Sequence, residues 1–149
     1  MLSHDEKNMI KIKKYNSLFY IKKFIPLFSE FYPKKTRKEI IKGLKTLKKT
    51  YKYDLLVAFQ NNEPIAIAGL TYGYLLYCDK FLRLSNIYVK PEYRKLGVAQ
   101  LLIAKAEIIA KKNNCPQIIL DSYIDNETAH KTYLKENFSI TAYHFTKKI

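Results

Sequence analysis

Residues 93–100, Tyr-Arg-Lys-Leu-Gly-Val-Ala-Gln, hold one of only four glycines in a chain of 149 residues. Arg94, Gly97 and Ala99 stand where an apolar, strand-like run ending at Val89 gives way to helical spacing. The start of a helix leaves backbone N–H groups unpaired at the positive end of its dipole, and small residues let an anion approach them. This spacing predicts a phosphate-binding turn, although a glycine before a helix also occurs as plain loop punctuation.

Other common catalytic and binding sites lack their residues in this chain. Three histidines (His4, His130 and His144) and two cysteines (Cys78 and Cys115) show no metal-ligand spacing, so no metal site is expected. There is no GxSxG elbow, no GxxxxGK[ST] phosphate loop and no GxGxxG after a strand. These absences weigh against hydrolase, nucleotide-triphosphate and dinucleotide functions.

The chain is basic, and its charge is concentrated in the first third. Residues 1–53 hold 15 Lys/Arg and 4 Asp/Glu, whereas residues 54–149 hold 12 and 9. A basic segment attracts nucleic acid or another anionic partner, and it also serves solubility. The hydrophobic content of 48% predicts a single folded domain over residues 1–149. The separated cysteines, the lack of a signal core and the lack of a long apolar run predict a cytoplasmic protein without a membrane partner.

Periodicity predicts the elements that must position the turn. Strands are expected at 8–14, 54–60, 64–72, 81–89, 117–123 and 140–146, and helices at 17–31, 36–49, 95–112 and 125–136. Pro26 is expected to divide the first helix, and Thr36 with Glu39 to form a capping box in the second. The strand-helix-strand order at 81–123 predicts a right-handed crossover between parallel strands, after an antiparallel meander. In such sheets ligands bind beyond the carboxyl end of the first parallel strand, where the turn lies.

Two motifs in these elements follow one family pattern. The segment 86–99, followed by Asn126-x-x-Ala129-x-x-x-Tyr133, resembles the GNAT superfamily of N-acetyltransferases. The coenzyme A loop of that family has the pattern Q/R-x-x-G-x-G/A, which the turn matches, and the resemblance covers residues 81–139 closely. It implies an α/β (α+β) fold with a mixed, mostly antiparallel central sheet, a parallel strand-helix-strand crossover and flanking helices.

The resemblance implies acetyl-coenzyme A (acetyl-CoA) as cosubstrate and direct transfer of its acetyl group to a primary amine in a ternary complex. The pyrophosphate would lie on the backbone amides of the turn, and the pantetheine arm along the preceding strand. The residues implied in cofactor binding are Ile87, Tyr88, Val89, Arg94, Lys95, Leu96, Gly97, Val98, Ala99, Gln100 and Asn126. A backbone N–H near Ile87 or Tyr88 would stabilise the oxyanion, and Tyr133 would protonate the leaving thiolate. No cysteine lies in the motifs, which speaks against a covalent acetyl-enzyme.

The group that deprotonates the acceptor amine is left open by the sequence. Where many members of the family place a carboxylate, on the strand before the coenzyme loop, this chain has Ser85 and Asn86. Asp121, Glu92, or an ordered water held by Asn86 and backbone carbonyls would then take the proton, with Asp121 ranked first. Alternatively, the acceptor amine has a low pKa and needs less help.

The expected acceptor is an amine of a small molecule, a peptide or a protein. The basic first third favours one less cationic than a polyamine or an aminoglycoside. One alternative is a basic nucleic-acid-binding module or a tRNA-directed acetyltransferase, although the lysine stripe at 38–49 lacks arginine and interleaved aromatic residues. Another is a non-catalytic relative that binds coenzyme A. Assembly into a homodimer stays open.

Overall fold

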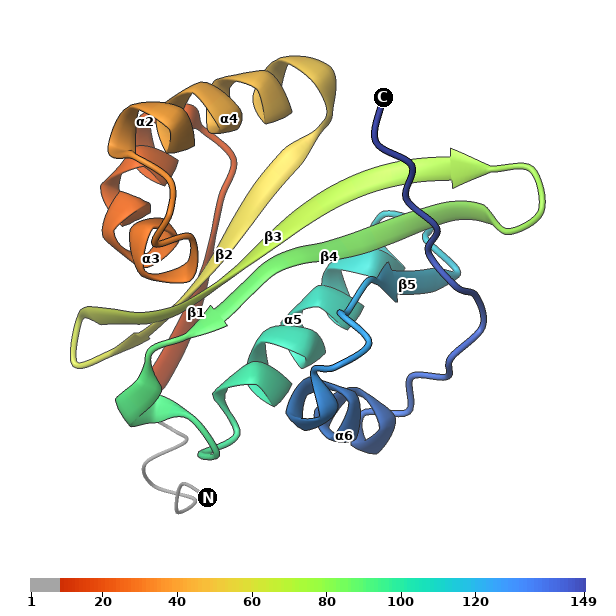
Figure 1. Ribbon diagram of the computed structural model, residues 1–149. Coiled ribbons are helices and arrows are strands. Elements are labelled where there is room, and N and C mark those ends of the chain that lie inside the picture. The colour runs from red at the N-terminus through yellow and green to blue at the C-terminus, as the bar shows by residue number, and fades with distance from the viewer. Residues whose placement is uncertain (1–8) are drawn as a thin grey trace. The chain divides into compact units, whose positions relative to one another are not determined.

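Five strands form one sheet in the order β1-β2-β3-β4-β5 (Figure 1). In the computed structural model, which describes residues 9–149, they are β1 (Ile10–Tyr15), β2 (Tyr53–Gln60), β3 (Glu63–Leu75), β4 (Asp79–Val89) and β5 (Gln117–Leu120). Neighbours from β1 to β4 are antiparallel, whereas β5 runs parallel to β4. This mixed, mostly antiparallel sheet with one parallel pair confirms the predicted fold class.

The helices lie before β2 and on either side of β5 in the chain. They are α2 (Leu18–Ile21), α3 (Ile25–Phe31), α4 (Arg37–Thr50), α5 (Val98–Lys112) and α6 (Glu127–Lys135), with short 3-10 turns η1 (Lys22–Phe24) and η2 (Pro91–Tyr93). The predicted helix at 17–31 is divided into α2, η1 and α3, with Pro26 in the first turn of α3. Proline is tolerated there because its missing N–H has no partner within the helix.

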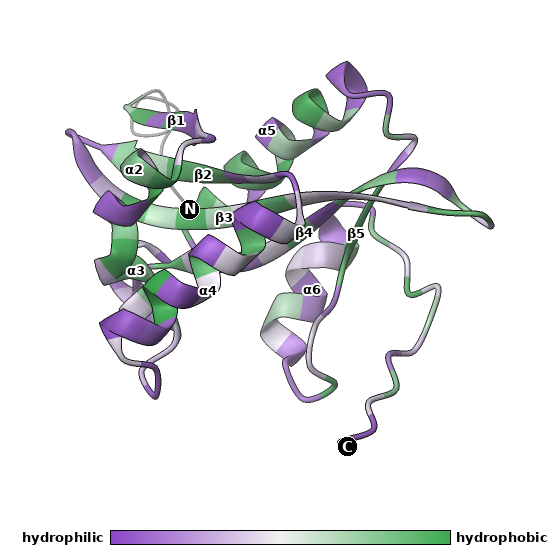
Figure 2. Cartoon of the chain, turned by 90° about the horizontal axis from the view of Figure 1, so that it is seen from above, coloured by the Kyte–Doolittle hydropathy of each residue, from purple (hydrophilic) through white to green (hydrophobic). Residues whose placement is uncertain are grey.

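Strand β2 separates the core into two layers. Its side chains alternate between the faces of the sheet, and Tyr53, Leu55 and Val57 join one buried cluster with residues of α2, α3 and α4. Helix α5 contacts β2, β3 and β4, and Figure 1 shows it on the other side of the sheet from α2–α4. Figure 2 shows hydrophobic residues along β2 and β3, with hydrophilic residues alternating along α4. The central strands β2 and β3 are therefore covered by helices on both faces.

The start of α4 has the capping box that the sequence predicts. The Thr36 hydroxyl accepts a hydrogen bond from the Glu39 N–H (3.2 Å), and the Glu39 carboxylate accepts one from the Thr36 N–H (2.7 Å). These hydrogen bonds to Thr36 hold the pKa of Glu39 below its usual value. The carboxylate is therefore ionised at neutral pH and fixed on the first turn of α4.

The β3–β4 hairpin is longer than predicted. The two strands were expected at 64–72 and 81–89, but pairing continues to Leu75 opposite Asp79. The tip exposes Leu76 (94%) and Tyr77 (84%), because the ladder continues past the part of the sheet that helices cover. Its backbone hydrogen bonds, rather than burial of its side chains, extend this ribbon.

Two other boundaries also differ from the prediction. Helix α5 begins at Val98 instead of residue 95, because Gly97 has a left-handed backbone (φ 87°) that cannot be part of a helix. Strand β5 ends at Leu120 instead of residue 123. The turn at 95–97 is consequently a separate structural feature before the helix.

Contacts divide the chain into two compact units, residues 1–119 and 120–149. In the second unit the Asn126 side chain caps α6 by accepting from the Ala129 N–H (3.2 Å), and Asn137 follows the helix with φ 63°. Asparagine is favoured at both positions, as an N-cap and in the left-handed conformation after a helix. No helix within residues 9–149 combines the length and apolar composition that a membrane span requires.

The predicted last strand at 140–146 was wrong. Residues 138–149 have no helix or strand, and the apolar side chains that suggested alternation, such as Ile140, Tyr143 and Phe145, are exposed. An alternating pattern shows which side chains a strand would bury, but a strand forms only with a backbone ladder to a neighbour. This segment has no such ladder in the structure.

Candidate active site

The turn before α5 is shaped to receive an anion. Lys95 (φ 61°) and Gly97 (φ 87°) both have left-handed backbones, and the first hydrogen bond of the helix runs from the Leu101 N–H to the Gly97 carbonyl (3.2 Å). The N–H groups of Val98, Ala99 and Gln100 therefore precede the helical ladder at the positive end of the dipole. Alternating left- and right-handed residues turn successive N–H groups toward one concave site, which suits a phosphate.

Arg94 lies beside this turn, but its side chain folds back onto β4. Its Nε donates to the Val89 carbonyl (2.9 Å), and the guanidinium stands 5.5 Å from the centre of the Tyr88 ring. Both contacts fix the end of β4 relative to the turn. They also keep a positive charge near the turn, while the role of Arg94 as a cofactor ligand stays a prediction.

Strand β4 contains a bulge three residues before it ends. Ser85 is opposite Gly69 and Tyr88 is opposite Ile67, so Asn86 and Ile87 together oppose the single residue Ala68. Asn86 has φ 52°, the left-handed conformation that glycine and asparagine tolerate best. A bulge re-aims the backbone groups of the extra residue out of the regular ladder. The predicted oxyanion donor near Ile87 thus lies at the one irregularity in the pairing of β3 with β4.

Four side chains converge at the bulge. The Asn86 Oδ1 accepts from the Tyr53 hydroxyl and from the Ser85 hydroxyl, each at 3.3 Å, while its Nδ2 donates to the Tyr32 hydroxyl. Tyr53 is fully buried, and burial raises the pKa of its phenol. The amide is hydrogen-bonded at both ends and has no basic lone pair, so Asn86 orients its neighbours and does not accept a proton.

Gly69, on the neighbouring strand, leaves the space in which these groups meet. A Cβ at this position would lie 2.8 Å from both the Asn86 Oδ1 and the Tyr53 hydroxyl, and 2.9 Å from the Ser85 Oγ. Such contacts are too short for any side chain. The sequence predicted Asn86 as a site residue, but not Tyr32, Tyr53 or Gly69, because they are distant in the chain and match no local motif.

A pocket of about 180 Å³ opens between α3, α4 and the bulge. Its lining residues are Phe28, Tyr32, Lys35, Glu39, Ile40, Gly43, Leu44, Leu47 and Asn86. Most of the walls are apolar, while the amide of Asn86 and the hydroxyl of Tyr32 add polar groups where the pocket meets β4. The ionised Glu39 and the Lys35 ammonium add one negative and one positive charge on the helical side.

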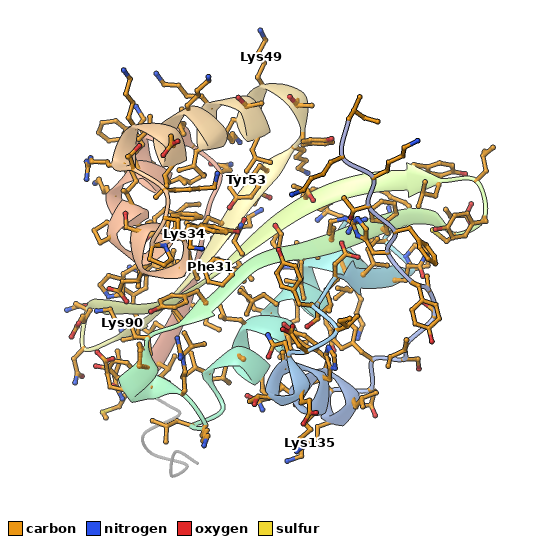
Figure 3. The ribbon with its side chains drawn as sticks, viewed as in Figure 1. Phe31, Lys34, Lys49, Tyr53, Lys90 and Lys135 are labelled. Atoms are coloured by element: carbon orange, nitrogen blue, oxygen red, sulfur yellow. The ribbon has the colours of Figure 1, made fainter. Side chains whose placement is uncertain are left out.

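The end of α3 also contacts β4 on the far side of Ile87. The Tyr88 hydroxyl donates to the Glu30 carboxylate (2.8 Å), and the Phe31 and Tyr88 ring centres are 5.6 Å apart. Burial, followed by the Glu30 carboxylate, raises the pKa of Tyr88. Figure 3 shows Phe31 extending from α3 toward β4. Three consecutive residues, Glu30 to Tyr32, therefore contact β4 immediately before and after Ile87.

The remaining predicted site residues lie in the second unit. The Tyr133 ring packs on Phe138 with centres 5.9 Å apart, and burial raises the pKa of its hydroxyl. Asp121 follows β5, half exposed, with its carboxylate 3.6 Å from the His144 ring. His130 Nε2 lies 2.9 Å from the Tyr123 carbonyl. The first unit thus brings together the turn, the bulge and the pocket, while Asn126, Tyr133 and Asp121 stay predictions for the same chemistry.

Glu92, the other carboxylate considered as a base, is exposed in η2. Neither Glu92 nor Glu30 lines the pocket, so the only carboxylate on its wall is that of Glu39.

Comparison with known proteins identifies the family to which the chain is similar. The sequence model described as "Acetyltransferase (GNAT) family" matches residues 20–138. An aminoglycoside N(6')-acetyltransferase type 1 of Acinetobacter haemolyticus is 33% identical over 105 residues, which cover 66% of this chain and 72% of that protein. A thialysine N-epsilon-acetyltransferase of Caenorhabditis elegans is 27% identical over 55 residues, or 37% of this chain and 34% of that one.

Among solved structures, an aminoglycoside N-acetyltransferase AAC(6')-Iy in complex with CoA superposes with a TM-score of 0.80. The two chains are 19% identical, and the superposition covers 94% of each. At that identity the likeness concerns the fold, which includes the crossover from β4 through α5 to β5.

Proposed function

Because the chain belongs to the GNAT family and is an acetyl-CoA-dependent N-acetyltransferase, we propose that it acetylates a primary amine on an aminoglycoside-like amino sugar. The observation that supports this proposal most is the pocket between α3, α4 and the β4 bulge, which has room for about one sugar ring. The rest of a larger acceptor would lie outside the pocket. The Acinetobacter haemolyticus relative, which matches over 105 residues, is named for this class of acceptor.

The charge on the pocket wall supports a cationic acceptor. Glu39 is ionised and fixed by its hydrogen bonds to Thr36, so it can pair with an ammonium group of the acceptor other than the one that reacts. The basic first third of the chain had suggested a less cationic acceptor. Among the described residues of that third, however, only Lys35 adds a positive charge to the pocket lining, so the repulsion is weaker there than the composition of the segment suggests.

In the proposed reaction, acetyl-CoA supplies an activated acetyl group as a thioester. The amine nitrogen forms a bond to the carbonyl carbon, and the backbone N–H of Ile87 or Tyr88 stabilises the oxyanion. The bond from carbon to sulfur then breaks, Tyr133 gives its proton to the thiolate, and the nitrogen loses a proton to water. The turn at 94–100 holds the pyrophosphate, Ile87 to Val89 pair with the pantetheine arm, and Asn126 supports the second motif.

One observation favours a second class of acceptor. Lys35 and Glu39 both line the pocket, so an amino acid with its carboxylate and ammonium groups would find a partner for each. The shorter match to a thialysine acetyltransferase supports this class.

Release of the CoA thiol, measured over a panel of amines, discriminates between these acceptors. We expect turnover with aminoglycosides that have an amine at the 6' position and at least about 100-fold less with partners that have a hydroxyl there. Thialysine and lysine form the second arm, and a peptide α-amine the third. Turnover confined to the second or third arm would exclude the amino-sugar proposal.

The pH dependence of the reaction tests how the amine loses its proton. Because Ser85 and Asn86 cannot act as bases, kcat/KM is expected to rise about tenfold per pH unit and to level off near the pKa of the free amine. Two acceptors with different amine pKa values should therefore give shifted profiles. The pKa of Tyr133 is raised above its ordinary value of 10, so its ionisation should cause no decline below that pH. A pH profile that is the same for both acceptors would instead reveal a protein base such as Asp121.

A further inference from the structure

We propose that Tyr32 and Tyr53 are positioning residues for acetyl transfer, because they hold the Asn86 amide and thereby the bulge that orients the Ile87 N–H. This inference rests on the proposed placement of the acetyl group beside the bulge. It does not depend on which amine is the acceptor.

Three hydrogen bonds hold the side chain of Asn86. The Tyr53 and Ser85 hydroxyls both donate to the Oδ1, and the Nδ2 donates to the Tyr32 hydroxyl. These three partners come from β2, from β4 itself and from the end of α3. An amide held from three elements cannot rotate without breaking hydrogen bonds in a largely buried site.

Holding the side chain also holds the backbone. Asn86 has φ 52°, and a non-glycine residue pays a conformational cost in this region that its surroundings must offset. Loss of these hydrogen bonds would leave the left-handed backbone of Asn86 less well fixed, and with it the direction of the Ile87 N–H. The hydrogen bonds from Tyr53 and Ser85 therefore stabilise the bulge and not only the amide.

Burial keeps the Tyr53 side chain out of the pocket. Its side chain is fully buried, and it is not among the residues that line the pocket. Its hydroxyl contacts the site through the hydrogen bond to Asn86. Tyr32 differs because it also lines the pocket, so its replacement can change acceptor binding directly.

The other side of Ile87 is fixed by the same helix end. Glu30 accepts a hydrogen bond from the Tyr88 hydroxyl at 2.8 Å. The guanidinium of Arg94 lies over the ring of the same tyrosine. The α3 end therefore restrains residues 86 and 88, and a shift of either one would displace the donor between them. Displacements of about 1 Å at such donors reduce rates strongly.

Replacement of Tyr53 by phenylalanine tests the proposal. The variant keeps the buried ring and loses one hydroxyl. We expect kcat to fall about tenfold, while the Kd of acetyl-CoA and the KM of the acceptor change less than about twofold. The matched control is Tyr72→Phe, which removes a hydroxyl that donates to Asp54 (3.1 Å) on the opposite face of the sheet. The kcat of Tyr72→Phe should stay within about twofold of the wild type, even if its melting temperature falls as much as that of Tyr53→Phe.

Asn86→Gly separates backbone freedom from hydrogen bonding. Glycine keeps the left-handed conformation accessible but deletes the amide. We expect it to lose kcat at least as much as Tyr53→Phe, and the double variant Tyr53→Phe/Asn86→Gly to lose no more than Asn86→Gly alone. Wild-type kcat in Tyr53→Phe or in Asn86→Gly would overturn the proposal.

A measurement without turnover keeps this inference distinct from the choice of acceptor. In protein bound to a non-reactive ketone analogue of acetyl-CoA, the backbone amide resonance of Ile87 should shift in Tyr53→Phe and stay in place in Tyr72→Phe. Tyr32→Phe provides the same test if Tyr53→Phe does not fold. Unchanged Ile87 resonances in the hydroxyl-deletion variants would show that the two tyrosines serve stability alone.

Discussion

Gly97→Glu is expected to abolish coenzyme binding, with a Kd for acetyl-CoA at least about 100-fold higher. Gly97 has φ 87°, a conformation that costs a side-chain-bearing residue about 1 kcal/mol or more. The new carboxylate would also lie among N–H groups at the start of α5, where it occupies the anion position and repels the pyrophosphate. Thermal unfolding with and without acetyl-CoA measures the loss, because saturating ligand stabilises the wild type by about 2.7 kcal/mol at 100 times the Kd.

Two variants at the same position separate conformation from charge. Gly97→Asn keeps a residue that tolerates the left-handed region and adds no charge, so most binding should persist. Gly97→Ala adds strain without charge and should be intermediate. A wild-type thermal shift in Gly97→Glu would mean that the turn does not hold the coenzyme.

Tyr133→Phe is expected to lower kcat about 100-fold without changing the affinity for acetyl-CoA. The phenylalanine keeps the ring that packs on Phe138, so α6 should stay folded. Only the hydroxyl is lost, and because burial raises its pKa, that hydroxyl is protonated at neutral pH and ready to donate. Pre-steady-state and steady-state thiol release would locate the loss in the chemical step.

Tyr143→Phe is the matched control for this prediction, because Tyr143 is an exposed tyrosine in the same unit. Its kcat should equal that of the wild type. If Tyr133→Phe also kept wild-type kcat, solvent would be the proton donor and Tyr133 a packing residue only.

Features that depend on a few neighbouring residues were predictable from the sequence. The break at Pro26 and the capping box of Thr36 with Glu39 each follow from the stereochemistry of one turn, whereas the left-handed Gly97 was missed and the helix was expected from residue 95. The family motif then combined the turn with β4 and α5. These elements contain the coenzyme side of the candidate site.

The acceptor side was not predictable, because it is assembled from distant residues. Asn86 meets Tyr32 across 54 positions and Tyr53 across 33, and Tyr88 meets Glu30 across 58. Such contacts depend on how helices pack on the sheet, which periodicity does not specify. The bulge was not predictable either, since nothing in the apolar run at 81–89 shows where two residues of β4 oppose one residue of β3.

The hydrogen bonds of Asn86 also bear on how this enzyme could change over generations. Asparagine and aspartate codons differ by a single base, so a carboxylate at this position is one mutation away. An aspartate could accept from the hydroxyls of Tyr53 and Ser85, and from that of Tyr32 once this hydroxyl turns from acceptor to donor. Three hydrogen bonds to one carboxylate favour its ionised form and so lower its basicity. A lineage that acquired aspartate here would therefore gain a well-positioned carboxylate that is only a weak base.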